Sequence, residues 1–286
     1  MSAALRTSPR GREFAFGPDD HAAIARLAYE EAGIVLPPAK MQLVYGRLVR
    51  RVRACGLAGF APYIELLERD DEERVHAIDA LTTNHTSFFR EDHHFDHFMA
   101  ETWPALAARS AAGGPVRLWS AACSSGEEPF SLAMAICGRD RQAAAALRRR
   151  DLRILATDLS TDILAAARTG RYSPETIRSV PPELRTVWVQ RVGDEAEVRP
   201  ELRALVAFRH LNLLGDWPMR GRFDAIFCRN VMIYFDEPTK ERLQTRLAER
   251  LAPGGFLYIG HSERLAGSVA SGFRCVGRTI FQKVAA

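Results

Sequence analysis

The stretch VRLWSAACSSGEEPFSLAMAIC, residues 116–137, constrains the fold more than any other part of the chain. Its first four residues are typical of a buried strand, and the small residues from Ser120 to Gly126 indicate a turn. A helix opens near Pro129, because the first helical position needs no backbone donor. Apolar residues then recur at i, i+3, i+4 and i+7, which predicts a single face packed on a sheet; they are Phe130, Ala133, Met134 and Cys137.

The turn is suited to a ligand, because small residues let a bound molecule approach the backbone closely. Glu127 and Glu128 lie where a pyrophosphate would bind at a helix N-terminus, and their carboxylates would repel it and attract a cation. This pattern disfavours NAD, FAD and ATP, and it favours S-adenosylmethionine, which carries an ammonium and a sulfonium group. A second interpretation is that the two acids only complement the helix dipole.

The composition is that of an ordinary soluble globular protein, with 47% hydrophobic and 26% charged residues among 286. That length predicts one large α/β domain and a smaller module. The five cysteines form no CxxC pair, so neither a disulfide framework nor a metal site is predicted. No apolar run reaches the ~18 residues that span a bilayer, and the N-terminus lacks the apolar core of a signal peptide. We expect a cytoplasmic protein without direct membrane insertion.

The N-terminal part is predicted to be a small helical module that follows a loose polar tail, residues 1–17. Its four helices are expected at about residues 19–31, 39–54, 61–67 and 72–81. The second of them presents a basic side, which consists of Lys40, Arg47, Arg50 and Arg51. No acidic residue lies between positions 40 and 53 to neutralise this side. It is therefore either a solvated face or a docking surface for an acidic partner.

A segment dense in hydroxyl and amide side chains, LTTNHTSFFREDHHF, begins at Leu81. In a purely structural interpretation Thr86 or Ser87 caps a helix and the two phenylalanines pack in a core. His93 and His97 share a helical face, which is the kind of spacing a zinc site uses. No third ligand stands at a recognisable spacing, so no metal is predicted.

A second strand is predicted at Arg153–Thr157, with Asp158 at its carboxyl end. An acid in that place accepts hydrogen bonds from a ribose diol in nucleotide-binding sheets. Asp158 is also able to cap the helix that follows, but Ser160 serves that purpose equally well. We therefore favour the ribose as the partner of Asp158.

Residues 171–207 contain two strand-like runs, Thr186–Val192 and Glu197–Val206, on either side of the turn Gly193–Ala196. This pattern predicts a β-hairpin insertion. Farther along, the apolar strand FDAIFC (223–228) ends in polar and aromatic groups, where open α/β sheets hold their ligands. Tyr234 in that segment is equally suited to packing. Strands alternate with helices and a terminal hairpin follows, which predicts an α/β fold with a mostly parallel sheet and an antiparallel edge strand.

Six strings occur in order from the linker to near the C-terminus: TTNHTSFFRE (82–91), WSAACSSGEEPFSLAM (119–134), ATDLSTDIL (156–164), LNLL (211–214), FDAIFCRNVMIYF (223–235) and LAPGGFLYIGHSE (251–263). Together they resemble the chemotaxis receptor protein-glutamate methyltransferases, the CheR family, within the class I S-adenosylmethionine-dependent methyltransferases. The resemblance implies a Rossmann-like, mostly parallel seven-stranded sheet. It also implies a helical receptor-recognition domain at 18–88 and a methyltransferase domain at 89–286, with a β insertion at about 185–207.

The resemblance further implies a pocket for S-adenosylmethionine, which leaves as S-adenosylhomocysteine. Its lining would be Asn84, Thr86 and Arg90 in the linker, Glu128 at the methionyl end, Asp158 at the ribose, Asn212 and Leu213 by the adenine, and Asn230 and Val231 by the methionine. Arg90 and Tyr234 would border the reacting groups. The basic helix would recognise acidic methylation helices in the cytoplasmic domain of membrane chemoreceptors, to whose arrays the protein would be recruited.

Family members that tether to a pentapeptide at the receptor's C-terminus have a longer, glycine-containing loop at the hairpin turn. This chain has only Gly193–Ala196 there, which disfavours tethering.

The chemistry that the resemblance implies needs placement rather than proton transfer. A glutamate side chain has a reference pKa of about 4.3, so it is ionised at neutral pH and needs no general base. It must lie in line with the sulfonium methyl group, and the fork of an arginine such as Arg90 is able to bind the carboxylate and aim one oxygen.

Two other functions are compatible with parts of the sequence. The basic side of the second helix suggests a nucleic-acid methyltransferase, but amino-group methyltransferases carry a prolyl-prolyl-aromatic motif where Val231 and Met232 follow Asn230 here. No nucleic-acid partner is therefore predicted. A non-catalytic module that senses S-adenosylmethionine in a signalling complex is the other alternative, against which the complete set of site residues argues.

Overall fold

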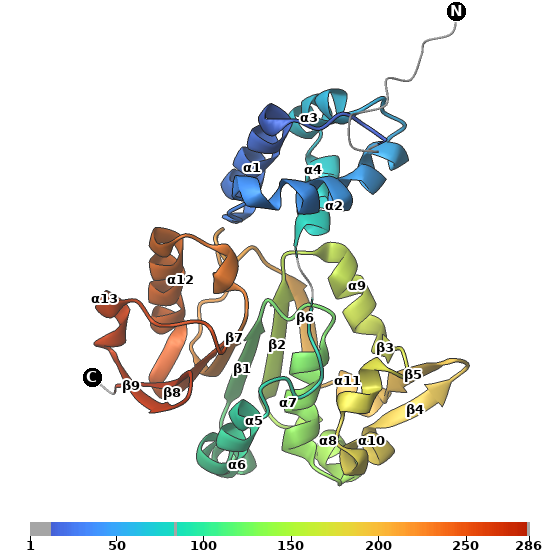
Figure 1. The fold of residues 1–286 in the computed structure, drawn as a ribbon. Helices are drawn as coiled ribbons and strands as arrows, with labels where there is room; N and C mark the ends of the chain where they lie inside the picture. Colours follow the sequence, from blue (N-terminus) through green and yellow to red (C-terminus); the bar gives the residue numbers. More distant parts are fainter. Residues whose placement is uncertain (1–12, 83–84, 285–286) are drawn as a thin grey trace, which may run out of the picture. The chain divides into compact units, whose positions relative to one another are not determined.

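The computed structural model describes residues 13–82 and 85–284, which divide into two compact units (Figure 1). One unit is helical and combines the described residues up to 82 with Tyr234–Asp236. The other contains the sheets and consists of the remaining described residues. Asn84 and most of the predicted N-terminal tail lie outside the described residues. No helix in the described part of the chain is long and apolar enough to cross a membrane.

The helical unit has the helices that the sequence predicts. They are α1 (Pro18–Ala32), α2 (Met41–Ala54), α3 (Phe60–Arg69) and α4 (Asp71–Leu81). Gly33 ends α1 in the left-handed conformation, with φ of 65°. The Asp70 side chain caps α4 by accepting hydrogen bonds from the Glu72 and Glu73 amides. Val44, Leu48 and Val52 bury one face of α2.

The other unit is built on a seven-stranded sheet with the order β6-β2-β1-β7-β8-β10-β9. The strands are β1 (Val116–Ala121), β2 (Leu152–Asp158), β6 (Val206–His210), β7 (Phe223–Cys228), β8 (Leu251–Ile259), β9 (Phe273–Gly277) and β10 (Ile280–Lys283). The first five in sheet order are parallel, and β10 runs antiparallel to both of its neighbours. This topology confirms the class I methyltransferase fold that the sequence predicts.

Helices precede β1 and connect the later strands of this sheet (Figure 1). They are α5 (His93–His97), α6 (Trp103–Ala111), α7 (Glu127–Cys137), α8 (Arg141–Arg148), α9 (Thr161–Thr169), α12 (Glu237–Arg250) and α13 (Gly267–Ala270). A π-helical turn, Phe98–Thr102, joins α5 to α6. Both α7 and α9 pack against β2 and β6.

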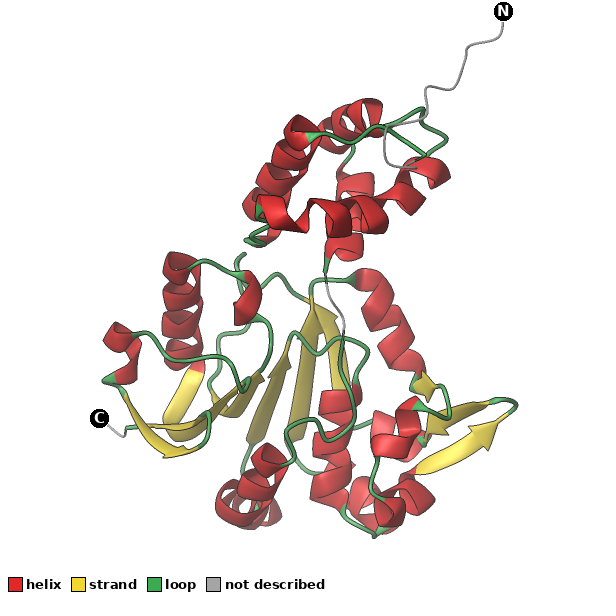
Figure 2. Ribbon diagram, in the orientation of Figure 1, coloured by secondary structure: helices red, strands yellow, loops and turns green. Residues whose placement is uncertain are grey.

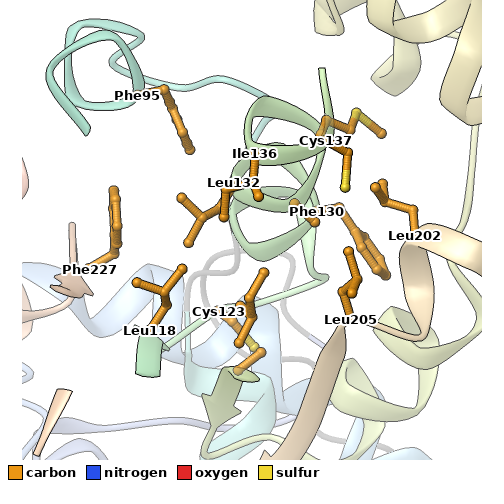
Figure 3. Close-up of a cluster of buried hydrophobic side chains, with 14 of the residues drawn as sticks. Phe95, Leu118, Cys123, Phe130, Leu132, Ile136, Cys137, Leu202, Leu205 and Phe227 are labelled. Atoms are coloured by element: carbon orange, nitrogen blue, oxygen red, sulfur yellow. The ribbon is translucent and has the colours of Figure 1, made fainter. Parts of the chain in front are cut away.

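The central helix α7 is buried on more than one side, which corrects the expectation of a single apolar face. Its four predicted core residues are indeed buried, but so are Leu132 and Ile136 between them. Figure 3 shows Phe130 on the side of Leu205, whereas Leu132 lies on the side of Phe227 of β7. A helix enclosed in this way holds its first turn, where Glu127 and Glu128 lie, firmly against the end of β1.

The insertion is more than the predicted hairpin. Figure 2 shows a small sheet apart from the large one, with the order β3-β5-β4. Its strands are β3 (Arg171–Tyr172), β4 (Val189–Val192) and β5 (Glu195–Val198), and the short helices α10 (Pro182–Trp188) and α11 (Pro200–Arg203) flank them. The two strand-like runs are therefore only partly correct. The first begins inside α10 before it becomes β4, and the second continues from β5 into α11. Its last residue, Val206, belongs to β6 of the large sheet.

Candidate active site

Polar side chains gather where parallel strands of the large sheet end. Asp158 closes β2, Arg229 and Asn230 follow β7, and His261 comes shortly after β8. The carboxyl ends of parallel strands meet at one edge of a sheet, which is where open α/β folds bind ligands. This edge is therefore the candidate active site.

The backbone near this edge is held in unusual conformations. Left-handed φ angles occur at six described non-glycine residues: Phe89, Glu91, Ala122, Ser124, Asn230 and Thr279. Two of them follow β1, one follows β7 and two lie in the linker that precedes α5. Each such conformation costs on the order of 1–3 kcal/mol and persists only when its surroundings fix it. Their concentration here is typical of a functional site.

Asp158 is 8% exposed, and its side chain braces the turn after β1. One oxygen accepts the Ser124 amide at 2.8 Å, and the other accepts the Ser160 amide at 3.0 Å. Burial raises the pKa of Asp158, while these amides act in the opposite direction. The side chain of Ser160 caps α9, as the sequence predicts, so Asp158 does not have to do so.

Glu128 is not the free carboxylate that the sequence suggests. Its Oε1 accepts the Ser120 hydroxyl at 2.7 Å, and its Oε2 pairs with the Arg229 guanidinium at 3.1 Å. Burial raises the pKa of Glu128, and Arg229 and Ser120 counteract it. Because one guanidinium neutralises much of its charge, Glu128 attracts a cation less strongly than an isolated carboxylate would.

Arg229 also pairs with a second carboxylate, that of Glu91, at 3.3 Å. The Arg229 side chain is 2% exposed and its Nη2 also donates to the carbonyl of Arg90. Burial by itself would raise the pKa of Glu91, but Arg229, His261 and Asn230 outweigh it and lower that pKa to about 2. Two carboxylates and one guanidinium leave this buried cluster with a net negative charge.

The loop after β7 is fixed by Glu263, a third buried carboxylate. Its oxygens accept the amides of Gly260 at 2.6 Å, Asn230 at 3.1 Å and Met232 at 2.8 Å. A Cβ on Gly260 would lie 2.5 Å from the Asn230 side chain, so this close approach requires glycine. Asn230 is thereby held in its left-handed conformation, with φ of 59°.

Gly126 serves packing rather than ligand access. Its φ is 95°, and a Cβ there would meet Ala167, Phe208 and the Tyr172 hydroxyl at 3.2 Å. The neighbouring side chains therefore leave no room for a Cβ at this position, whatever ligand approaches the rest of the turn. Its neighbour Glu127 is also turned inward, 4% exposed, with a 2.7 Å hydrogen bond from Ser125, and burial raises its pKa. Neither of the two acids is a solvated residue that merely faces the helix dipole.

The remaining residues that the resemblance implies are divided between the two units. Arg90 and Thr86 are half-buried in the linker, where Arg90 Nη1 donates to the His85 carbonyl at 2.8 Å. Asn212 and Leu213 follow β6, whose end is tied to β2 by the Leu211 amide on the Asp158 carbonyl at 2.9 Å. Val231 follows Asn230.

Tyr234 belongs to the helical unit, where its carbonyl accepts the Val35 amide at 2.9 Å. Its predicted catalytic role stays a prediction.

The basic side of α2 is partly neutralised from outside the helix. Glu73 of α4 accepts the Arg51 guanidinium and the Tyr63 hydroxyl, the latter at 2.7 Å. Arg47 donates to the Leu81 carbonyl, whereas Arg50 is exposed. The expectation of a wholly unneutralised cluster is therefore wrong at Arg51. The docking role of these residues, with Lys40 among them, stays a prediction.

The histidines near α5 serve the fold. His94 is fully buried, with its Nε2 3.0 Å from the Thr279 hydroxyl, and His97 Nδ1 is 3.1 Å from that of Tyr258. Burial, Arg229 and His93 lower the pKa of His94 to about 3, so it is neutral at pH 7. Among the described residues no group of three or more His, Cys, Asp or Glu is arranged to hold a metal ion.

Sequence reasoning missed Arg229, Glu91 and Glu263, although each lies in a string that carries the family resemblance. The sequence signal was a charged residue directly after an apolar strand or inside a polar linker. These three residues matter because they contact residues that are distant in sequence but meet at the carboxyl edge of the sheet, and the order of residues does not reveal such contacts.

The donor set suits S-adenosylmethionine. The Arg229 cluster keeps an excess of negative charge for a cationic group, and Asp158 supplies a buried carboxylate at the end of β2 for a diol. Both lie at the carboxyl edge of the same sheet.

Removing the charge of Asp158 tests the ribose assignment. Asp158→Asn is expected to weaken the binding of S-adenosylhomocysteine about 10- to 100-fold, since hydrogen bonds to a charged group are worth about 1.5–3 kcal/mol. Calorimetric titration measures the change. Asp194→Asn, at an exposed position of the small sheet's turn, is the matched control. Equal affinities of the two variants would rule out the assignment.

Two family models match this chain. The model of the CheR methyltransferase, all-alpha domain covers residues 19–82, and that of the CheR methyltransferase, SAM binding domain covers 84–281. The chain is 42% identical over 262 residues to the probable chemotaxis protein methyltransferase of Rhizobium etli, covering 90% of this chain and 96% of that protein. It is 41% identical over 278 residues to chemotaxis protein methyltransferase 2 of Pseudomonas aeruginosa (94% and 95%). It is also 41% identical over 266 residues to the chemotaxis protein methyltransferase of Escherichia coli (90% and 88%).

Proposed function

We propose a mechanism for this chain on the premise that it belongs to the CheR methyltransferase family. It is a chemotaxis protein methyltransferase, which transfers the methyl group of S-adenosylmethionine to glutamate side chains of chemoreceptors. The observation that carries this function is the match of both family models, which together extend from residue 19 to residue 281. The product on the receptor is a glutamate γ-methyl ester, and S-adenosylhomocysteine is released.

The bound cofactor supplies an electrophilic methyl group on a positively charged sulfur. Asp158 would hold its ribose, and Glu128 would face its methionyl end. Asn230 and Val231 would contact the methionine moiety, with Asn212 and Leu213 beside the adenine. Thr86 and Asn84, the latter outside the described residues, would complete the pocket.

Arg90 would bind the substrate carboxylate. Its guanidinium presents two parallel N–H groups to a carboxylate, which fixes the direction of the oxygen that attacks. The substrate is already ionised, so the protein has no proton to move. As the carboxylate becomes an ester its negative charge disappears, and the hold of Arg90 weakens, which favours product release. Tyr234 would wall or hydrogen-bond the methyl site without accepting a proton.

The net negative charge of the Arg229 cluster supports this proposal. A sulfonium and a carboxylate lose their charges together in the reaction, so a water-excluding site must stabilise both of them beforehand. Glu91 and Glu128 provide negative charge on the cofactor side, while Arg90 provides positive charge for the substrate.

The helical unit would recognise the receptor's cytoplasmic domain through the basic side of α2. Arg50 is the exposed member of that side, whereas Arg51 is occupied by Glu73. With a turn of only two residues, Gly193 and Asp194, between β4 and β5, the small sheet is not expected to tether a receptor pentapeptide. A cytoplasmic location at receptor arrays is part of this proposal.

Charge reversal at Arg50 tests the docking surface. Arg50→Glu is expected to raise KM for the receptor about tenfold and leave kcat unchanged, because like charges across an interface oppose association. Initial rates at several receptor concentrations separate the two constants. Arg69→Glu, an exposed arginine that ends α3, changes the net charge equally. An equal rise of KM in both variants would contradict a specific surface.

The function itself is tested by methyl transfer. Purified protein is incubated with tritiated S-adenosylmethionine and a panel of receptor signalling domains, and label is released as methanol in alkali. Base-labile incorporation into a receptor supports glutamate methylation. Cofactor binding without transfer to any receptor would instead indicate a non-catalytic sensor.

A further inference from the structure

Glu91 has more polar neighbours than any role named so far requires. Its Oε1 accepts the Asn230 side-chain amide at 3.2 Å and the His261 amide at 3.3 Å, and it lies 3.0 Å from His261 Nδ1. Its Oε2 pairs with Arg229 and lies 3.5 Å from His94 Nδ1. These partners come from α5 and from the segments that follow β7 and β8. One carboxylate therefore joins three elements beside the candidate active site.

The same carboxylate is linked through Arg229 to the backbone of Arg90. Arg229, which Glu91 pairs with, donates to the Arg90 carbonyl. On the other side of Arg90, the Phe89 amide donates to the Ser131 hydroxyl of α7 at 2.9 Å. Arg90 is thus held between two fixed points, one of which depends on the charge of Glu91.

The turn that these contacts hold is strained. Phe89 and Glu91 both have left-handed φ angles, of 52° and 55°, although neither is glycine. Two such residues on either side of Arg90 would relax toward ordinary conformations if their contacts were lost. The backbone position from which the Arg90 side chain extends is therefore held by the Arg229 and Ser131 contacts.

We propose that Glu91 is a positioning residue that aims Arg90 at the substrate carboxylate through Arg229 and the strained turn at residues 89–91. The inference rests on the proposed function, because it assigns Arg90 the substrate carboxylate. Glu91 itself does not touch the reacting atoms. His94, buried and neutral, lies beside its buried Oε2.

The test is Glu91→Gln, which keeps the size of the side chain and removes its charge. Asp96→Asn makes the same kind of change at an exposed position of α5 and is the matched control. We expect Glu91→Gln to lower kcat about 100-fold, because a misplacement of roughly 1 Å has an effect of that size. KM for the receptor should stay within about threefold, and so should the Kd for S-adenosylhomocysteine, because this product lacks the sulfonium charge that the carboxylate of Glu91 would attract. Glu91→Asp restores the charge and should recover part of kcat.

A merely structural role would give a different pattern. If kcat, KM and cofactor affinity all worsen together with the melting temperature, or if kcat stays within about twofold of the unchanged protein, the positioning role is overturned. Failure of the rescue by Glu91→Asp, with Glu91→Gln and Glu91→Asp equally inactive and equally unstable, overturns it as well.

A readout without catalysis separates this inference from the proposed function. Hydrogen exchange of the Phe89 amide should be about tenfold faster in Glu91→Gln than in Asp96→Asn, because its bond to Ser131 depends on the turn. If the unchanged protein methylates no receptor, the proposed function fails, and the exchange rates still decide whether Glu91 holds the turn. Equal exchange rates in the two variants would overturn the inference.

Discussion

Arg90→Ala is expected to lower the rate of receptor methylation about 100- to 1,000-fold, the usual effect of removing a charged group that orients the reacting atoms. The substrate carboxylate would still enter the site, but no fork would aim its oxygen at the methyl group. Single-turnover transfer of tritiated methyl groups measures the change. Because Asp158 and Glu128 are untouched, S-adenosylhomocysteine should still bind.

Two further variants complete this experiment. Arg191→Ala removes an exposed arginine of the small sheet and should leave the rate unchanged. Arg90→Lys keeps the positive charge without the planar fork, and its rate should lie between those of the alanine variant and the unchanged protein. A rate for Arg90→Ala within about threefold of the Arg191→Ala control would remove Arg90 from the mechanism.

Arg229→Met is expected to lower the free energy of unfolding by about 3–5 kcal/mol, because it leaves the buried carboxylates of Glu91 and Glu128 without their shared cation. Methionine keeps much of the apolar volume of the arginine side chain, so the decrease in the free energy of unfolding reflects the lost charge rather than lost packing. Urea unfolding followed by circular dichroism measures it. Arg117→Met removes the exposed Arg117–Asp151 pair and should cost less than about 1 kcal/mol.

The triple variant Glu91→Gln, Glu128→Gln, Arg229→Met tests whether unpaired carboxylates cause the loss of stability in Arg229→Met. Replacing both carboxylates by neutral amides removes the unpaired charges, so the triple variant should be more stable than Arg229→Met alone. If it is less stable than Arg229→Met alone, the arginine stabilises the fold mainly through its contacts with neutral groups, such as the ring of Phe95, 5.7 Å away.

Local patterns in the sequence predicted the α/β fold, because the formation of its strands and helices depends mainly on residues that are close in sequence. The apolar run of β7 and the end of α1 at Gly33 are examples, since strand burial and helix capping are settled within a few positions. The insertion was predicted only in part. Its first strand-like run includes the end of α10 and its second includes α11, because a few apolar residues suit either structure.

The candidate site was harder to predict, because its charges pair over long separations. The sequence placed Glu128 and Asp158 at the carboxyl edge of the sheet, but not the arginine between Glu128 and Glu91. Arg229 contacts Arg90 across 139 positions of the chain, and no spacing rule connects them. Similarly, Arg51 has no acidic neighbour in its own helix but finds Glu73 in another, 22 positions away.

The contact between His94 and Thr279 has a consequence for biosynthesis. It joins residues 185 positions apart, and Thr279 lies in the turn between β9 and β10. A ribosome adds about 5–20 residues per second, so the early segment waits for roughly ten seconds or more before this turn can emerge. During translation the nascent chain must therefore carry His94 without its hydroxyl partner until a late segment joins the sheet.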